Sequence, residues 1–160
     1  MTRPFFRLVF LLFIVALVWP LVANSQLSNR SLAVAPLHES DMDYGCGCSF
    51  HYPPSKREKG ATILQWELGN KANIRVDGSL RKLELRSERF IPDRNGSVKV
   101  GDRAVFELQG NGVDVVARCT VVWACRPEDE ACEVTWFRGT ATVTTERGRI
   151  EVPVWAGCGC

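Results

Sequence analysis

The chain has 160 residues, with 20 lysines and arginines against 18 aspartates and glutamates. Arg3 and Arg7 are the only charged residues among the first 25, so the remaining 135 residues carry 18 charges of each sign. A neutral domain with interleaved charges lacks the basic patch on which nucleic-acid binding depends, and we expect no such partner. A segment of that length can form one domain with its own hydrophobic core.

Residues 1–25 have the layout of a secretory signal peptide. Arg3 and Arg7 precede an unbroken apolar run, Leu8–Val18, and the small residues of Ala23–Ser25 offer a cleavage site. The alternative is a retained membrane anchor formed by residues 5–23, because about 20 apolar residues span a bilayer. An arginine and a proline interrupt that stretch and favour cleavage. We therefore expect a periplasmic or secreted protein that contacts a membrane only if the segment is retained.

The part that follows divides into an arm and a domain. Residues 26–44 mix serine, asparagine, proline, histidine and acids without a period of 2 or 3.6, which predicts a flexible arm. Residues 45–160 contain all seven cysteines and form the predicted domain.

Short strands are predicted along most of this domain. In Ala61–Leu68, apolar residues alternate with Gln65 and Glu67, as in a strand with one buried face. Asp77–Gly78 and Asn111–Gly112 are strong hairpin signals, because a type I′ turn needs positive φ at both central positions. About nine such strands, separated by turn residues, predict an all-β fold that is an antiparallel sandwich or barrel.

Seven cysteines in an exported chain indicate disulfides, since oxidising compartments let them persist. Cys125 and Cys132 flank a six-residue polar loop, and this spacing suits a disulfide between neighbouring strands. The pairing also predicts a register with two apolar pairs on one face, Trp123 with Val134 and Val121 with Trp136. Cys119 shares the face of Val121 in this register, and we expect it to be a free, buried thiol.

The remaining four cysteines lie in two identical segments, Gly45–Cys48 and Gly157–Cys160. If these segments pair as antiparallel strands, joining Cys46 to Cys160 also places Cys48 opposite Cys158. Residues two apart on a strand point to the same side, so the four sulfurs would gather on one face.

Three kinds of chemistry suit four converging sulfurs. The first is a pair of structural disulfides, Cys46–Cys160 and Cys48–Cys158, which the exported location favours. The second is a metal site in which the same four cysteines bind zinc or copper as thiolates. The third is thiol–disulfide exchange through Cys158 and Cys160.

No set of catalytic side chains is recognisable, because His38 and His51 both lie outside the strand-rich region. We expect a non-catalytic exported domain, without a cofactor, that binds an unidentified protein or small ligand or forms part of an envelope structure. A metal-binding protein and a thiol–disulfide oxidoreductase are the alternatives. Four tryptophans of the domain are expected in the core or at its rim, or around a ligand pocket inside a barrel: Trp66, Trp123, Trp136 and Trp155.

Overall fold

The computed structural model describes residues 31–54, 60–67, 69–92, 98–126 and 132–160. The predicted signal peptide lies outside these residues, as do the centres of several predicted loops. Leu32–Cys160 forms one compact unit. No helix in the described ranges is long and apolar enough to cross a membrane.

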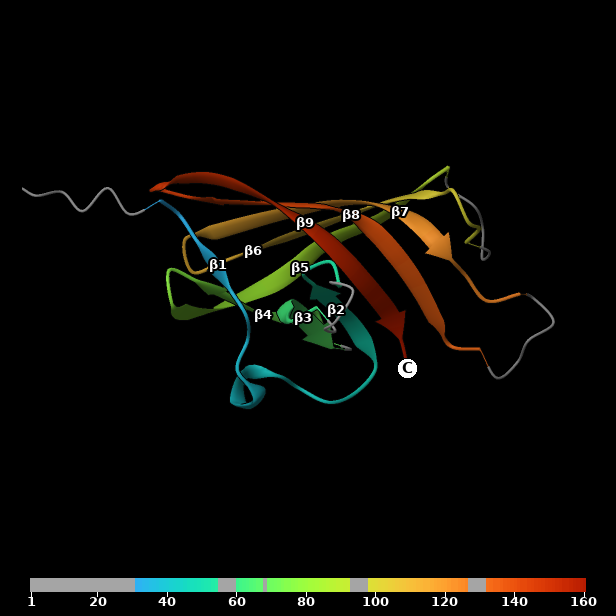
Figure 1. Cartoon of the computed structure of the whole chain (residues 1–160), viewed down its shortest axis with the longest axis horizontal. Helices are drawn as coiled ribbons and strands as arrows, with labels where there is room; N and C mark the ends of the chain where they lie inside the picture. The colour runs from blue at the N-terminus through green and yellow to red at the C-terminus, as the bar shows by residue number, and fades with distance from the viewer. Residues whose placement is uncertain (1–30, 55–59, 68, 93–97, 127–131) are drawn as a thin grey trace, which may run out of the picture. The chain divides into compact units, whose positions relative to one another are not determined.

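The described residues form nine strands and one 3-10 turn (Figure 1). Every strand pair is antiparallel. The elements in chain order are β1 (Val34–Ala35), η2 (Glu39–Asp41), β2 (Gly47–His51), β3 (Thr62–Glu67), β4 (Lys71–Val76), β5 (Ser79–Ile91), β6 (Arg103–Gly110), β7 (Val113–Trp123), β8 (Val134–Thr145) and β9 (Gly148–Gly159).

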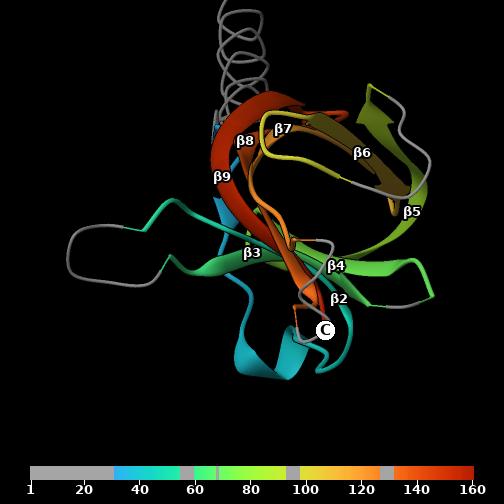
Figure 2. The same ribbon diagram turned by 90° about the vertical axis from the view of Figure 1, so that its right-hand side faces the viewer.

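Strands β2 to β9 form a closed barrel in which each strand pairs with the next strand along the chain. The β9–β2 pair completes the ring, which is visible end-on in Figure 2. The predicted all-β antiparallel fold is confirmed, and of the two predicted architectures the barrel is the one observed. Tight turns connect the strands at one end: Asp77–Gly78 and Asn111–Gly112 have positive φ at both residues, as predicted for type I′ hairpins.

Alternate side chains point into the barrel and fill it. Along β7, every second residue from Val113 to Val121 is buried. Aromatic rings occupy the centre, with centroid distances of 5.6 Å for Phe50–Phe106 and 5.4 Å for Trp66–Phe106. An eight-stranded barrel is just wide enough for side chains to fill its interior. The predicted pocket inside the barrel is therefore occupied, at this level, by the protein's own aromatic side chains.

The part of the predicted arm that the structure describes lies against the barrel. Strand β1 pairs with the end of β4, where Val34 is opposite Val76. Leu32, Val34 and Leu37 are buried, and the Tyr52 hydroxyl donates a hydrogen bond of 2.7 Å to the Val34 carbonyl. Burial of these apolar side chains stabilises the attachment, so residues 32–37 belong to the barrel even though their sequence has no regular period.

An ion pair holds the next part of this segment. The Arg75 guanidinium of β4 binds both carboxylate oxygens of Asp41, at 2.5 and 3.1 Å. The backbone N–H of His38 also donates to Asp41, at 2.9 Å. The hydrogen bond from Arg75, followed by that from His38, lowers the pKa of Asp41 below its ordinary value of 3.8. Asp41 is thus a charged anchor between the arm and the barrel wall.

Candidate functional site

The two glycine–cysteine segments lie side by side at the end of the barrel opposite the tight turns. Strand β2 pairs with β9 so that Cys48 is opposite Cys158 and Gly47 is opposite Gly159. Disulfides join Cys46 to Cys160 and Cys48 to Cys158, with Cα separations of 4.3 and 4.0 Å. Cys48 is buried and Cys158 packs against the core, so the inner disulfide lies on the apolar face.

This pairing bears on the two chemical alternatives. A thiolate site needs reduced sulfurs, whereas here each sulfur is bonded to another. Among the described side chains, no group of three or more histidine, cysteine or acidic residues is arranged to hold a metal ion. Exchange chemistry within one segment would need a Cys158–Cys160 bond, while the structure joins each of these residues to the other segment.

The third disulfide joins Cys125 to Cys132, with a Cα separation of 5.4 Å. The register predicted from this pair is wrong by one residue at Val121, which is opposite Phe137, and by two at Trp123, which is opposite Trp136. The offset grows because β7 contains one extra residue between Val121 and Trp123. Such a bulge turns the side chains that follow it to the other face of the sheet.

Tryptophan side chains lie on the outside of the barrel, and the bulge adds Trp123 to them. Trp123 is 45% exposed and Trp136 is 36% exposed, whereas Phe137, the next residue along β8, is buried. Trp155 of β9 lies beside Trp136, with ring centroids 6.3 Å apart and planes inclined by 35°. Of the four tryptophans in the domain, Trp66 alone is in the core.

Glycine forms the floor next to these rings. Gly157 is opposite Trp136, and a Cβ atom at Gly157 would lie 2.8 Å from Cζ3 of the indole. The ring of Trp136 therefore lies over Gly157. A shallow recess of about 220 Å³ adjoins it, and its walls include Gly47, Ser49 and Gln65. We call the exposed indoles of Trp123 and Trp136, the partly buried indole of Trp155 and this recess together the tryptophan face.

The polar side chains that line the recess are uncharged. They are His51, Ser49 and Gln65, and no lysine, arginine, aspartate or glutamate of the described residues is among them. Beside the recess, the exposed Arg138 is opposite Trp155. Burial lowers the pKa of His51 below its ordinary value of 6.5, so its imidazole is neutral at pH 7. Its Nδ1 is 3.1 Å from the Thr62 hydroxyl, which fixes the orientation of the ring.

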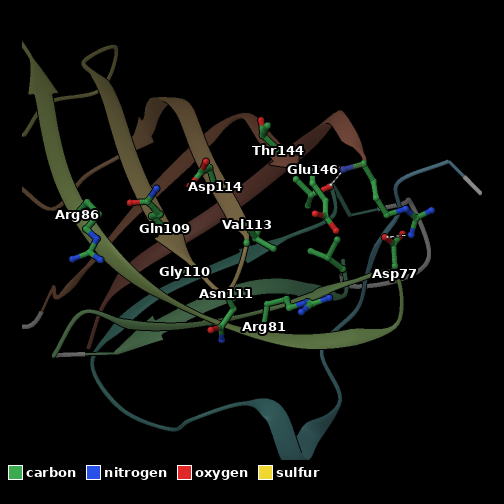
Figure 3. A pocket seen from close by; sticks show the side chains of 14 residues that line it. Asp77, Arg81, Arg86, Gln109, Gly110, Asn111, Val113, Asp114, Thr144 and Glu146 are labelled. Carbon is green, nitrogen blue, oxygen red and sulfur yellow. Dashed lines mark hydrogen bonds and ion pairs between the residues drawn. The ribbon is translucent and has the colours of Figure 1, made fainter.

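A larger recess, of about 710 Å³, opens at the other end of the barrel, between the tight turns (Figure 3). Arg81 enters it from the inner face of β5, and Arg147 binds Asp77 at 2.6 Å on its edge. The charged residues that line it are three arginines and three acids: Arg81, Arg86, Arg147, Asp77, Asp114 and Glu146. The formal charges of these side chains therefore balance, while the Nε of Arg81 is buried without a hydrogen-bond partner among the described residues.

Cys119 is unpaired and buried on the inner face of β7. Burial raises the pKa of its thiol to about 12. A thiolate is the reactive form of cysteine, so this residue is chemically inert while the protein stays folded.

Sequence reasoning missed the tryptophan face. The predicted register placed Trp123 and Trp136 on the face of Val121, and the bulge that turns Trp123 outward has no signal in the sequence. Trp136 and Trp155 could have been assigned to the outside, because each alternates with buried residues of its own strand, such as Phe137 and Val154.

Comparison of the chain with models of protein families, with curated proteins and with solved structures gave no match. By its own features, Leu32–Cys160 is a disulfide-stabilised β-barrel domain.

Proposed function

We propose that this protein is an exported, non-catalytic binding domain that holds its partner on the tryptophan face. The observation that carries the proposal is the exposure of Trp123 and Trp136 beside Trp155 on the outside of a barrel whose inside is filled. Folding gains from burying indoles, so a group of them left in solvent marks an interaction site. Tryptophan is also among the residues that contribute most to binding energy at interfaces.

The disulfides support this role by making the surface rigid. The tryptophan face spans β7, β8, β9 and β2, and the two disulfides between β2 and β9 cross-link the last two of these strands. A surface that is already ordered loses less conformational entropy on binding. Three disulfides also suit an oxidising compartment, which agrees with the proposed periplasmic or secreted location.

Co-sedimentation of the purified, oxidised protein with the insoluble envelope fraction of the source cells tests the proposal. We expect retention of the native protein and a loss of about thirtyfold in affinity for Trp136→Ala, which corresponds to about 2 kcal/mol at a central interface residue. Ile91→Ala is the matched control, because Ile91 is 41% exposed but lies on β5, away from the tryptophan face. Equal retention of all three proteins would contradict the proposal.

A further inference from the structure

We propose that the partner of the tryptophan face is an uncharged polysaccharide, whose sugar rings stack on the indoles. This inference rests on the proposed binding function and specifies its ligand class. Three properties of the face lead to it: the arrangement of the rings, the neutral polar groups beside them, and the absence of an open strand edge beneath them.

The ring arrangement suits a chain of sugars. One face of a pyranose carries mainly C–H groups, and this face packs on the flat surface of an indole. Trp136 and Trp155 have centroids 6.3 Å apart, and Trp123 is directly across from Trp136 on the neighbouring strand. Successive sugar residues of one chain can therefore contact successive indoles.

The recess supplies neutral hydrogen-bonding groups at the edge of these rings. The Ser49 hydroxyl has no hydrogen-bond partner among the described residues. Gln65 is oriented by the backbone of Asp43, which donates to its Oε1 at 3.1 Å and accepts from its Nε2 at 2.8 Å. An amide nitrogen has two hydrogens, so one remains for a ligand. The uncharged donors and acceptors of the recess match the hydroxyls of a neutral sugar. The charged residues beside the face, Glu67 opposite Gly47 and Arg138 opposite Trp155, have opposite signs and together favour neither an anionic nor a cationic ligand.

The strand order argues against a peptide that binds by strand addition. Strands β8, β9 and β2 each have a partner on both sides, so their backbone N–H and C=O groups are already used within the sheet. Peptides that bind by strand addition need a free sheet edge. A ligand on this face must therefore be held by ring surfaces and side chains, which is how a polysaccharide is held.

Electrophoresis in native gels that contain a soluble polysaccharide tests the inference. The neutral probes are laminarin, xylan, galactomannan and dextran, alginate is the anionic probe, and a decaproline peptide is titrated separately. We expect at least one neutral probe to retard the native protein, with affinity reduced about tenfold or more in Trp136→Ala and Trp155→Ala. Trp136→Phe, which keeps an aromatic surface, should retain part of the binding, and Ile91→Ala should retain all of it.

Several outcomes would overturn the assignment of the ligand class. No retardation by any neutral probe, retardation by alginate alone, or equal retardation of native protein and Trp136→Ala overturns the assignment to a neutral polysaccharide. Binding of decaproline that depends on Trp136, without binding of any polysaccharide, also overturns it. If retention on the envelope fraction still depends on Trp136 in these cases, the binding function survives and only the ligand class is wrong. Thermal unfolding of each variant identifies any that fail to fold, and quenching of native tryptophan fluorescence by the probes gives a measurement free of mutation.

Discussion

The indole of Trp136 lies over Gly157, so that a methyl group added to Gly157 would come within 2.8 Å of the ring. In Gly157→Ala we expect the ring to move outward, because its far edge is free to rotate into solvent. The free energy of unfolding should fall by about 1 kcal/mol, at the low end for overpacking, while tryptophan fluorescence and any Trp136-dependent binding change clearly.

Gly139→Ala is the matched comparison for this substitution. A Cβ at Gly139 would lie 2.1 Å from the Arg118 carbonyl oxygen and 2.6 Å from the Cys119 Cα, and neither backbone atom can move aside alone. We expect a larger loss, of about 3 kcal/mol. Urea unfolding of both variants measures the difference, and an equal loss in the two would show that the Trp136 ring is fixed in place.

The two disulfides between β2 and β9 should be strongly non-additive. They close loops of 114 and 110 residues, but each closes only a short loop when the other is present. In the chain-entropy model, a short loop contributes about 2 kcal/mol and a loop of this length about 5 kcal/mol. Replacing Cys48 and Cys158 by serine should therefore cost about 2 kcal/mol, and replacing all four cysteines should cost about 7 kcal/mol. Chemical unfolding of the variants tests this, and two equal, additive losses would contradict the argument.

Cys119 should be the one thiol found by titration. Because burial raises its pKa to about 12, we expect no reaction with Ellman's reagent at pH 8 in the native protein and one equivalent after unfolding in denaturant. The intact mass of the non-reduced protein should be six hydrogens below that of the fully reduced chain, as three disulfides require. Four additional thiols together with about one zinc or copper ion per chain would instead support the metal-binding alternative.

Stability should depend on pH in two separate windows. Burial lowers the pKa of His51 in the folded protein, so the unfolded chain takes up this proton first as the pH falls. The contribution of neutral His51 to the free energy of unfolding is complete above about pH 6.5 and is lost progressively as the pH falls below that value. His51→Gln should flatten the stability curve in this window, whereas a curve unchanged by the substitution would contradict the assignment.

The second window belongs to Asp41. Its pKa in the folded protein is lowered, chiefly by the hydrogen bond from Arg75, so its contribution is complete above about pH 3.8 and is lost as the pH falls through the folded value. Asp41→Asn should remove this acid dependence and leave the His51 window unchanged. Chemical unfolding of the native protein and of Asp41→Asn between about pH 2.5 and about pH 5 measures this acid dependence. Asp43→Asn is a control on the same segment.

Some features followed from the sequence because a single local rule determines them. The turn at Asn111–Gly112 needs only the backbone freedom of its two residues, and the register of Cys48 with Cys158 follows from one pairing of equally spaced cysteines. The number of strands and their antiparallel arrangement follow from alternation and turn spacing.

Other features depend on contacts that no local pattern contains. The extra residue between Val121 and Trp123 turns Trp123 outward, although the unbulged register also matched apolar residues with each other. The burial of Leu32 and Leu37 depends on contacts with strands distant in the chain, such as the hydrogen bond from the Leu37 N–H to the Thr62 carbonyl. The choice of a barrel over a sandwich depends on whether β4 pairs with β5 while β9 pairs with β2, which is a property of the whole sheet.

Within the described residues, β9–β2 is the one barrel pairing between strands distant in the chain, since every other barrel pair joins consecutive strands. Consecutive hairpins form through contacts that are close in sequence, whereas the β9–β2 pair must form between the two ends of the domain. If the two disulfides between β2 and β9 were reduced and these strands separated, the barrel would become an open sheet with two unpaired edge strands. Free edge strands pair readily with those of another molecule, so we expect reduction to promote self-association.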